Sequence, residues 1–533
     1  MTDTIESNDC DVLIAGAGPI GQILALLLAQ QGLRVTVVER WEQPYPLPRA
    51  VALSHDNLRV LHQLGLREEL APLLEPWGQE GHVFKVTDAS GQTLAESQIT
   101  MDSESGLANM SGFSQPDLER LLEQRVRVNP LIEQRRGFSI EALSEDAAHG
   151  VTATIRPHNG LALIPGGEPE YIRADYVVGC DGANSTVRSL LGTEMTDLDF
   201  SHDWLVVDVL PHTPPDWLPY ACQHLDPARS TTLVPSGPGR RRWEFMVMPD
   251  DDQDNVDTDE NSWRLLKAWG IHPGNAELVR HARYTFRGRW ANQWRRGRVL
   301  LAGDAAHQMP PFMGQGINSG IRDAASLAWR LALLVRGKGR DSLLDDYGTE
   351  RSAHVAQIIE QTVFIGRMFC ATDPKECAER DAMIKAMGTL DIQDASKNWR
   401  LEGGTVRGDG IGGALSVQAR VGTGERTALL DELVPPPGFL LLGRDRNPGD
   451  LLSATQRAAW TKLLGRSVHF GPGGLTDSEG KYAAWFERLD AEVVLVRPDF
   501  QVFGGARTPQ AADDLVNDLI QLVLGQPVSS EKE

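Results

Sequence analysis

The chain has 533 residues, of which 41% are hydrophobic and 23% charged, and its formal net charge at pH 7 is -21. Single hydrophobic cores rarely grow beyond about 250–300 residues, so this length predicts more than one domain in a globular protein of ordinary composition. The negative charge argues against nucleic acids and anionic membranes as partners, because both would repel the protein.

The first elements of the chain predict a βαβ unit. An apolar run over 11–15 is typical of a buried parallel strand, 21–31 of a buried helix and 33–38 of a second strand. The sequence Gly16-Ala17-Gly18-Pro19-Ile20-Gly21 joins the first strand to the helix with the spacing of a dinucleotide-binding turn, and Glu39 follows the second strand directly. This arrangement predicts a dinucleotide site.

Each glycine of this turn has its own physical task in such a site. Gly16 allows the tight turn, Gly18 leaves room for the pyrophosphate, and Gly21 lets the helix pack closely on the strand. The phosphates lie at the free N–H groups of the helix start, and Glu39 accepts hydrogen bonds from a ribose. The unit therefore predicts these dinucleotide-binding residues: Gly16, Gly18, Pro19, Ile20, Gly21, Glu39 and Arg40.

The middle of the chain mixes helical and β-rich segments. We expect, in chain order, a helix over 53–66, a helix that begins near Gln115 with Ser114 as its cap, strands over 140–155 and 171–178, a turn and helix start over 179–188, and strands over 204–210 and 242–248. The β-rich stretch over 200–289 predicts a sheet built over the nucleotide domain.

A second glycine-rich signature lies far along the chain from the first. A predicted strand over 299–302 leads into Gly303-Asp304-Ala305-Ala306-His307, and Pro310 precedes Gly314-Gln315-Gly316-Ile317-Asn318 and a predicted helix over 318–335. The N–H groups of this loop would converge at a positive helix end and stabilise the negative charge of a reduced flavin. Together the signatures indicate one dinucleotide held at both ends, which suits a tightly kept FAD better than an exchanging NAD.

The C-terminal part predicts a small separate α/β domain. Residues 401–424 are rich in glycine and predict a linker, and strands and helices then alternate over 439–442, 454–464, 493–497 and 512–524. This domain contains no cysteine.

The cysteines and the apolar runs predict a reduced cytoplasmic protein. Five cysteines are scattered along the chain without a C-x-x-C pair, so neither a disulfide framework nor a metal site is expected. The longest apolar runs fall far short of the roughly 20 residues that cross a bilayer. The acidic N-terminus does not have the plan of a signal peptide.

These signatures resemble those of the flavoprotein aromatic hydroxylases, the single-component FAD monooxygenases with the p-hydroxybenzoate hydroxylase fold. Pro48-Arg49-Ala50, 113–119 and 181–182 fit this family. Three further segments, 241–249, 298–331 and 495–499, resemble its 3-(3-hydroxyphenyl)propionate hydroxylases. The resemblance implies an α/β fold with an FAD-binding Rossmann-like domain, an inserted β-rich substrate domain and a C-terminal thioredoxin-like domain that lacks CxxC. The implied parts are 1–190 and 291–400 for the FAD domain, 191–290 for the substrate sheet, 401–424 for the linker and 425–533 for the C-terminal domain.

The resemblance also implies roles for single residues. Arg49 would lie against the phosphates, and Gln115 would contact the phosphate–ribityl region. Asp304 would accept a ribityl hydrogen bond, and Pro310 would lie beside the isoalloxazine. Asp181 would serve both FAD and the nicotinamide cofactor. Plainer interpretations are a surface ion pair for Arg49 and a helix start for Gln115. The second signature completes the predicted cofactor residues with Gly303, Gly314, Gly316, Ile317 and Asn318, whereas His307 is predicted to cap its turn.

The implied reaction adds one oxygen atom to a phenol. NADH or NADPH would reduce FAD, dioxygen would add at flavin C4a as a hydroperoxide, and OH would pass to the ring ortho to its hydroxyl. A base near the ring would speed this step. His55 is the first candidate, since imidazole titrates near neutral pH, and Asp56 could orient or replace it; an ordinary helix start is the competing interpretation of His55.

Substrate recognition is less well determined by the sequence. Arg242, within Arg240-Arg241-Arg242, could bind a substrate carboxylate, although strand alternation lets only one or two of the three face a pocket. Arg242 and Pro310 are the predicted substrate residues. A solvated basic cluster is the alternative.

Other interpretations stay open. The substrate is expected to be a 3-(3-hydroxyphenyl)propionate-like phenol or, alternatively, a polycyclic polyketide-like phenol. A flavin halogenase would need a W-x-W-x-I-P signature, which this sequence lacks. A non-catalytic flavoprotein would show no substrate-stimulated oxidation of NAD(P)H. A plain NAD-dependent dehydrogenase would not explain the second signature over 303–318. A homodimer is one option for the oligomeric state.

Overall fold

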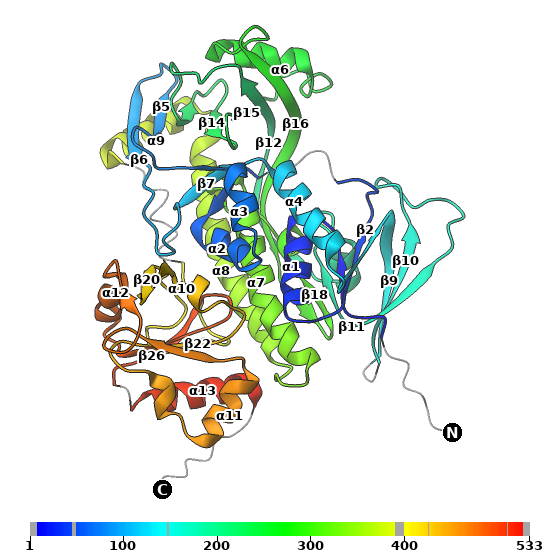
Figure 1. Cartoon of the computed structure of the whole chain (residues 1–533). Helices are drawn as coiled ribbons and strands as arrows, with labels where there is room; N and C mark the ends of the chain where they lie inside the picture. Colours follow the sequence, from blue (N-terminus) through cyan, green and yellow to red (C-terminus); the bar gives the residue numbers. More distant parts are fainter. Residues whose placement is uncertain are drawn as a thin grey trace.

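A largely parallel sheet is built around the predicted βαβ unit (Figure 1). The computed structural model describes residues 8–44, 50–146, 149–389, 399–424, 426–508 and 510–525. Strand β1 (Cys10–Ala15) pairs in parallel with β2 (Val35–Glu39) and with β11 (Glu170–Gly179), and helix α1 (Pro19–Gln30) connects β1 to β2. The predicted strand, helix and strand are therefore confirmed, with small differences at their ends.

The rest of this sheet comes from distant parts of the sequence. Its order is β17-β18-β11-β1-β2-β8, with the β9–β10 hairpin attached to β11. The added strands are β8 (Ile132–Arg136), β9 (Phe138–Asp146), β10 (Gly150–Pro157), β17 (Arg295–Arg296) and β18 (Val299–Leu301). The pairing of β18 with β11 brings the second glycine-rich signature beside the first.

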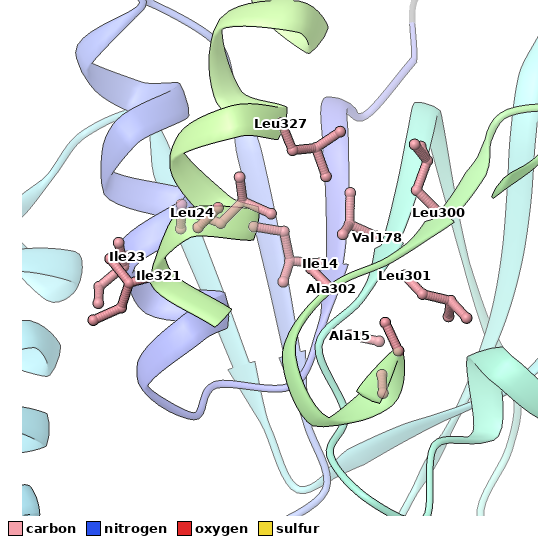
Figure 2. Packing of buried hydrophobic residues seen from close by; sticks show 14 of the residues in the cluster. Ile14, Ala15, Ile23, Leu24, Val178, Leu300, Leu301, Ala302, Ile321 and Leu327 are labelled. Carbon is pink, nitrogen blue, oxygen red and sulfur yellow. The ribbon is translucent and has the colours of Figure 1, made fainter. Parts of the chain in front are cut away.

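Helices α1 and α7 (Gly316–Val335) cover one face of this sheet. Figure 2 shows Ile14 of β1 and Val178 of β11 packed beneath Leu24 of α1 and Leu327 of α7. All four side chains are completely buried. A strand covered on both faces needs apolar residues at consecutive positions, which explains the continuous apolar runs in the sequence.

The second large sheet is mostly antiparallel and has the order β19-β16-β12-β15-β14-β13-β5-β6. Its strands are β5 (Val83–Asp88), β6 (Thr93–Gln98), β12 (Met195–Pro211), β13 (Ala221–Leu225), β14 (Thr231–Pro235), β15 (Arg241–Met246), β16 (Ala276–Ala291) and β19 (His307–Gln308). Residues such as Trp243 and Phe245 face helix α6 (Asp259–Leu266), and alternate residues point to the opposite face of the sheet. The strands predicted over 204–210 and 242–248 lie in β12 and β15.

Two local predictions near the first signature need correction. Residues Ala52–Ser54 form strand β3, because they pair with β7 (Met110–Phe113), so helix α2 (His55–Gln63) is shorter than the predicted 53–66. Strand β4 (Leu74–Pro76) completes this small sheet. Helix α4 (Gln115–Val128) begins at the predicted residue, but the Ser114 side chain accepts no hydrogen bond from its first turn.

Further helices complete the N-terminal two thirds of the chain. They are α3 (Arg67–Leu70), α5 (Thr186–Leu191), α8 (Leu343–Phe369) and α9 (Pro374–Met387). Helix α8 packs against α7 and β16, so it joins the two large sheets. Figure 1 shows this long helix alongside α7.

The C-terminal part has its own four-stranded sheet, β23-β22-β25-β26. Its strands are β22 (Leu440–Gly443), β23 (Arg466–His469), β25 (Val493–Val496) and β26 (Val502–Ala506), and its helices are α10 (Leu430–Leu433), α11 (Ala454–Lys462), α12 (Lys481–Leu489) and α13 (Ala512–Leu524). Helices α11 and α13 pack on one face and α12 on the other. The predicted alternation of strands and helices is confirmed, and the thioredoxin-like character stays a prediction.

The predicted linker is packed rather than loose. Thr405, Ser416 and Ala419 are buried, and Arg420–Thr423 form strand β20, which pairs with β21 (Arg426–Leu429) and β24 (Thr476–Asp477). Glycine enrichment here reflects close backbone contacts: a Cβ at Gly412 or Gly413 would collide with main-chain oxygens. The segment therefore connects the two parts of the chain through a shared interior.

All five cysteines lie in the part of the chain that the structure describes. All five cysteines are free thiols, four of them buried. No group of three or more potential metal ligands occurs among the described residues. None of the helices placed in the structure has both the length and the apolar character needed to cross a bilayer. The cytoplasmic location and the homodimer stay predictions.

Candidate active site

One cavity of about 790 Å³ lies where the two large sheets meet. Both glycine-rich signatures contribute to its wall, together with β12 to β16 and a few residues from beyond Trp399. The predicted cofactor and catalytic residues that line it are Gly16, Gly18, Pro19, Ile20, Glu39, Arg40, His55, Asp56, Gln115, Asp181, Asp304, Gly314, Gly316 and Ile317. Segments that are remote from each other in the sequence therefore border one space.

Several predicted residues lie behind this wall. Gly21 and Gly303 are packed against the protein: a Cβ at Gly21 would collide with the Gly16 carbonyl, and a Cβ at Gly303 would press on Ile20. Pro310 is buried next to the cavity lining without being part of it. Arg49 lies outside the described residues.

The first signature has the geometry of a dinucleotide turn. Gly16 has φ +101°, and a Cβ there would collide with the Cys180 carbonyl, so only glycine fits. The Glu39 carboxylate, at the end of β2, accepts hydrogen bonds from the N–H of Ala17 at 2.7 Å and of Trp41 at 2.9 Å. These contacts hold the carboxylate beside the start of α1.

Two glycines leave space that only a ligand would use. A Cβ at Gly18 or Gly316 would have no atom within 4 Å, and neither residue has a positive φ. Both line the cavity at the N-termini of α1 and α7, where free N–H groups attract negative charge. The residues present therefore fit a ligand with negative groups near two helix starts, as FAD has at its phosphates and at its reduced ring.

Asn318 fixes the loop of the second signature. Its amide nitrogen donates to the carbonyls of Gly314 at 2.6 Å and Ala52 at 3.1 Å, and its Oδ1 accepts from the Ser54 N–H at 3.0 Å. The side chain is completely buried and does not line the cavity. The Asn318 side chain thus positions the loop against β3, and the role of this residue toward a cofactor stays a prediction.

Gln115 and Asp181 are both held by the protein. Gln115 accepts the Ala50 N–H at 2.8 Å and donates to Glu119 at 2.6 Å. Asp181 accepts the N–H groups of Thr186 at 2.7 Å and Val187 at 3.1 Å, so it caps helix α5. Both side chains still border the cavity, and their roles toward a cofactor stay predictions.

His55 and Asp56 differ in their fitness as bases. Burial lowers the pKa of His55, and its Nδ1 lies 2.9 Å from the Ser105 hydroxyl. Burial would raise the pKa of Asp56, but Arg322, whose Nε donates to the carboxylate at 2.6 Å, holds it below the usual range. A neutral imidazole accepts a proton more readily than a carboxylate already paired with a guanidinium. Asp56 is therefore poorly suited to replace His55.

Arg242, the predicted carboxylate-binding residue, is placed away from the cavity surface. It is 2% exposed, and its Nε and Nη2 donate to the two oxygens of Asp208 at 2.7 and 2.9 Å. The bidentate ion pair with Asp208 therefore neutralises the Arg242 guanidinium within the protein. Arg240 and Arg241 approach Asp117 and Glu75 instead.

Sequence reasoning missed a buried polar centre behind the second signature. Asp323 of α7 accepts the Gly303 N–H at 3.0 Å, His307 Nε2 lies 2.7 Å from it, and Arg351 Nε of α8 donates to it at 2.8 Å. The prediction that His307 caps its own turn is thus wrong. His307 and Asp323 lie on different elements, and their separation in the sequence carries no local pattern that would have revealed the contact.

The part of the cavity against the second sheet combines aromatic and aliphatic side chains with polar ones. Its lining includes Trp77, Phe84, Val206, Phe286 and Phe312. This composition fits a flat apolar ring. The fold and the cavity together define a Rossmann-type dinucleotide-binding protein with an adjoining chamber against the second sheet.

Comparison with known proteins gives the family. The FAD binding domain family matches residues 9–362, and the HcaD C-terminal domain family matches residues 413–522. The probable NADH-specific resorcinol 4-hydroxylase of Rhodococcus jostii (strain RHA1) is 35% identical over 525 residues, covering 97% of this chain and 96% of that protein. The 3-(3-hydroxy-phenyl)propionate/3-hydroxycinnamic acid hydroxylase of Mycobacterium avium (strain 104) is 33% identical over 537 residues, covering 95% and 91%.

A solved structure agrees with this assignment at the level of the fold. The flavin-dependent monooxygenase PieE, in complex with FAD and substrate, superimposes with a TM-score of 0.81 at 23% identity and covers 98% of this chain and 100% of that chain. The chain belongs to the FAD-dependent aromatic hydroxylases. It is a flavin monooxygenase with FAD as its cofactor, as the two signatures predicted.

Proposed function

We propose that this protein uses NADH or NADPH and dioxygen to hydroxylate a small phenol next to its existing hydroxyl group. The observation that carries the proposal is that one cavity of about 790 Å³ has a wall joining the FAD signatures to the chamber against the second sheet. Two curated relatives that span nearly the whole chain are a probable resorcinol 4-hydroxylase and a 3-(3-hydroxy-phenyl)propionate/3-hydroxycinnamic acid hydroxylase, which supports a monocyclic phenol over a polycyclic one.

The chain's own residues would bind and orient the reactants. Bound FAD supplies the redox chemistry, namely the acceptance of a hydride and the activation of dioxygen. The turn at Gly18 would hold the pyrophosphate, and the start of α7 at Gly316 would place its N–H groups near the negative edge of the reduced ring. Trp77, Phe286 and Phe312 would exclude water from the phenol ring.

The test of this proposal is a screen with the yellow holoenzyme. Resorcinol and 3-(3-hydroxyphenyl)propionate are added separately, NADH and NADPH oxidation is followed, and the product is identified by mass spectrometry. We expect a phenol to stimulate oxidation and to gain one oxygen atom. A halogenated product in the presence of halide, or no stimulation by any phenol, would contradict the proposal and favour a halogenase or a non-catalytic flavoprotein.

Asp304→Ala is expected to weaken FAD binding about tenfold or more, because a hydrogen bond to a charged group contributes about 1.5–3 kcal/mol. Asp304 lines the cavity in the short helical turn Gly303–Ala305. The measurement is the ratio of flavin to protein absorbance after gel filtration. Asp341→Ala, which removes a carboxylate that is 71% exposed, is the control. Full flavin loading of Asp304→Ala would contradict the proposed hydrogen bond between Asp304 and the ribityl chain.

His55→Ala is expected to slow hydroxylation about a hundredfold while flavin reduction by NADH changes little, because general-base catalysis acts only on the oxygen-transfer step. Stopped-flow absorbance separates the two rates. The control is His62→Ala, on the same helix but outside the cavity lining. Equal hydroxylation rates in His55→Ala and the wild type would leave His55 as a helix-start residue.

A further inference from the structure

A row of polar side chains crosses the second sheet where it borders the chamber. Glu244 on β15 lies directly opposite Thr232 on β14, which lies opposite Gln223 on β13. All three side chains line the cavity. The Thr232 hydroxyl donates to Gln223 Oε1 at 2.7 Å, and Gln223 Nε2 donates to the Ser230 hydroxyl at 3.0 Å. Thr232 and Gln223 are thus satisfied within the sheet.

The Glu244 carboxylate differs from these two side chains. It is 6% exposed and lines the cavity, so its carboxylate oxygens open onto the chamber and are not among the enclosed polar atoms that the protein leaves without a partner. The nearest cation is Arg242, whose Nη1 lies 3.8 Å away and whose other nitrogens are held by Asp208. A buried carboxylate without hydrogen bonds is costly, and buried polar groups in native proteins nearly always have a partner. The chamber in front of Glu244 is the place from which a donor would come.

The surroundings of Glu244 define the kind of donor. The side chains that β13, β14 and β15 contribute to the cavity wall include no cation. The neighbouring strands contribute the apolar Val206 and Phe286, and β16 adds Tyr284, Thr285 and one cation, Arg287. An aromatic ring with a hydroxyl group matches such a chamber, because its face packs on apolar groups and its O–H donates to the carboxylate. A substrate carboxylate would meet a like charge in a water-poor site.

We propose that Glu244 accepts a hydrogen bond from a ring hydroxyl of the substrate and restricts the enzyme to phenols without a carboxylate. This inference rests on the proposed function and narrows its substrate class to uncharged hydroxybenzenes, of which resorcinol is the simplest dihydroxylated probe. Glu244 is a specificity residue in this account, and the oxygen-transfer step does not depend on its changing protonation.

The pH dependence of binding has a definite sign. Burial raises the pKa of Glu244 to about 7, although Arg242 and Arg280 oppose this shift and Asp208 adds to it. Tyr284 of β16 also lines this region of the cavity, and Arg287 lines it further along the same strand. The ionised carboxylate is the stronger acceptor and predominates above pH 7, whereas a phenol keeps its proton to about pH 10. Binding of an uncharged phenol should therefore strengthen between pH 6 and pH 8.

The experiment measures binding to the oxidised holoenzyme, without NADH, through the change in flavin absorbance. Resorcinol and 3-(3-hydroxyphenyl)propionate are titrated at pH 6 and pH 8 into wild type, Glu244→Gln and Glu244→Asp. For the wild type we expect resorcinol to bind more tightly than the propionate. In Glu244→Gln we expect resorcinol binding at pH 8 to weaken about tenfold, its pH dependence to disappear and propionate binding to strengthen about tenfold. Glu244→Asp should retain the preference for resorcinol.

The control is Glu75→Gln, which removes a half-buried carboxylate at Tyr220 and Arg241, outside the cavity lining, and should leave both affinities unchanged. Unchanged affinities in Glu244→Gln, or a wild type that prefers the propionate, would overturn the inference while phenol hydroxylation by the wild type still stands. If no phenol binds the wild type or stimulates NADH oxidation, the proposed function itself fails. Should Glu244→Gln not fold, the wild-type preference, its pH profile and Glu244→Asp decide the matter.

Discussion

Replacement of Asp323 by alanine is expected to lower the free energy of unfolding by about 3–5 kcal/mol and to abolish tight FAD binding, because the substitution leaves a buried guanidinium without its partner. Burial opposes ionisation of Asp323, but His307 and Arg351 outweigh it and hold its pKa below the usual range. The same carboxylate orients the Gly303 N–H, so its loss would also disturb the turn that carries Asp304.

Urea unfolding followed by tryptophan fluorescence, together with the flavin content of the purified protein, measures both effects of Asp323→Ala. The matched control is Asp345→Ala on helix α8, whose carboxylate is 66% exposed and pairs with Arg295 at 2.9 Å. An exposed ion pair of this kind contributes less than about 1 kcal/mol. Similar unfolding midpoints for the two variants would show that the buried centre does not organise the FAD site.

Arg497→Met is the second substitution for which we expect a large loss, again about 3–5 kcal/mol, because it leaves the two buried carboxylates Glu350 and Asp499 with only one buried guanidinium, that of Arg330. Arg497 donates to Asp499 at 3.0 and 2.6 Å and to Glu350 of α8 at 3.0 Å. Glu350 in turn accepts Arg330 of α7 at 2.8 Å and the Thr405 N–H at 2.6 Å. One completely buried network thus joins both long helices to the C-terminal part.

A double variant distinguishes charge imbalance from simple loss of packing. In Arg497→Met/Asp499→Asn the excess negative charge is removed while Glu350 keeps Arg330, so the double variant should be more stable than Arg497→Met alone. Thermal unfolding with limited proteolysis of the C-terminal part provides the measurement. Additive losses in the double variant would mean that Arg497 acts through its volume and not through its charge.

Local patterns were enough to predict the elements of the FAD-binding part. The apolar run of β1 and the glycine spacing after it depend only on neighbouring residues, so both were evident from the sequence. The prediction of a helix over 53–66 was wrong at its first residues for the opposite reason. Its first residues become a strand because β7, which follows much later in the chain, supplies their hydrogen bonds. Pairing at such distance leaves no periodic signal in the segment itself.

The parts of the cavity wall that consist of a local sequence motif could be predicted. Ion pairs between residues that are distant in the sequence could not. The turn at Gly16–Gly21 and the loop at Gly314–Ile317 were located by spacing alone. Arg242 was assigned to a substrate because its partner Asp208 lies far from it in the sequence, on another strand. The alternation of β15 does contain a usable signal: Arg242 and Glu244 share one face while Trp243 and Phe245 share the other. That pattern marks the polar face of β15, on which Glu244 lines the chamber while Arg242 is buried in its ion pair with Asp208, and the Glu244 carboxylate was overlooked.

Residues near the end of the chain complete the wall of the FAD and substrate cavity. Leu415 and Gln501, bridged to each other, border the same cavity as His55 and Arg322. A chimera in which the C-terminal part comes from a relative would therefore have a changed cavity wall. Recombination near Arg400 should succeed only when donor and recipient match at these two positions and in the charges buried at the junction.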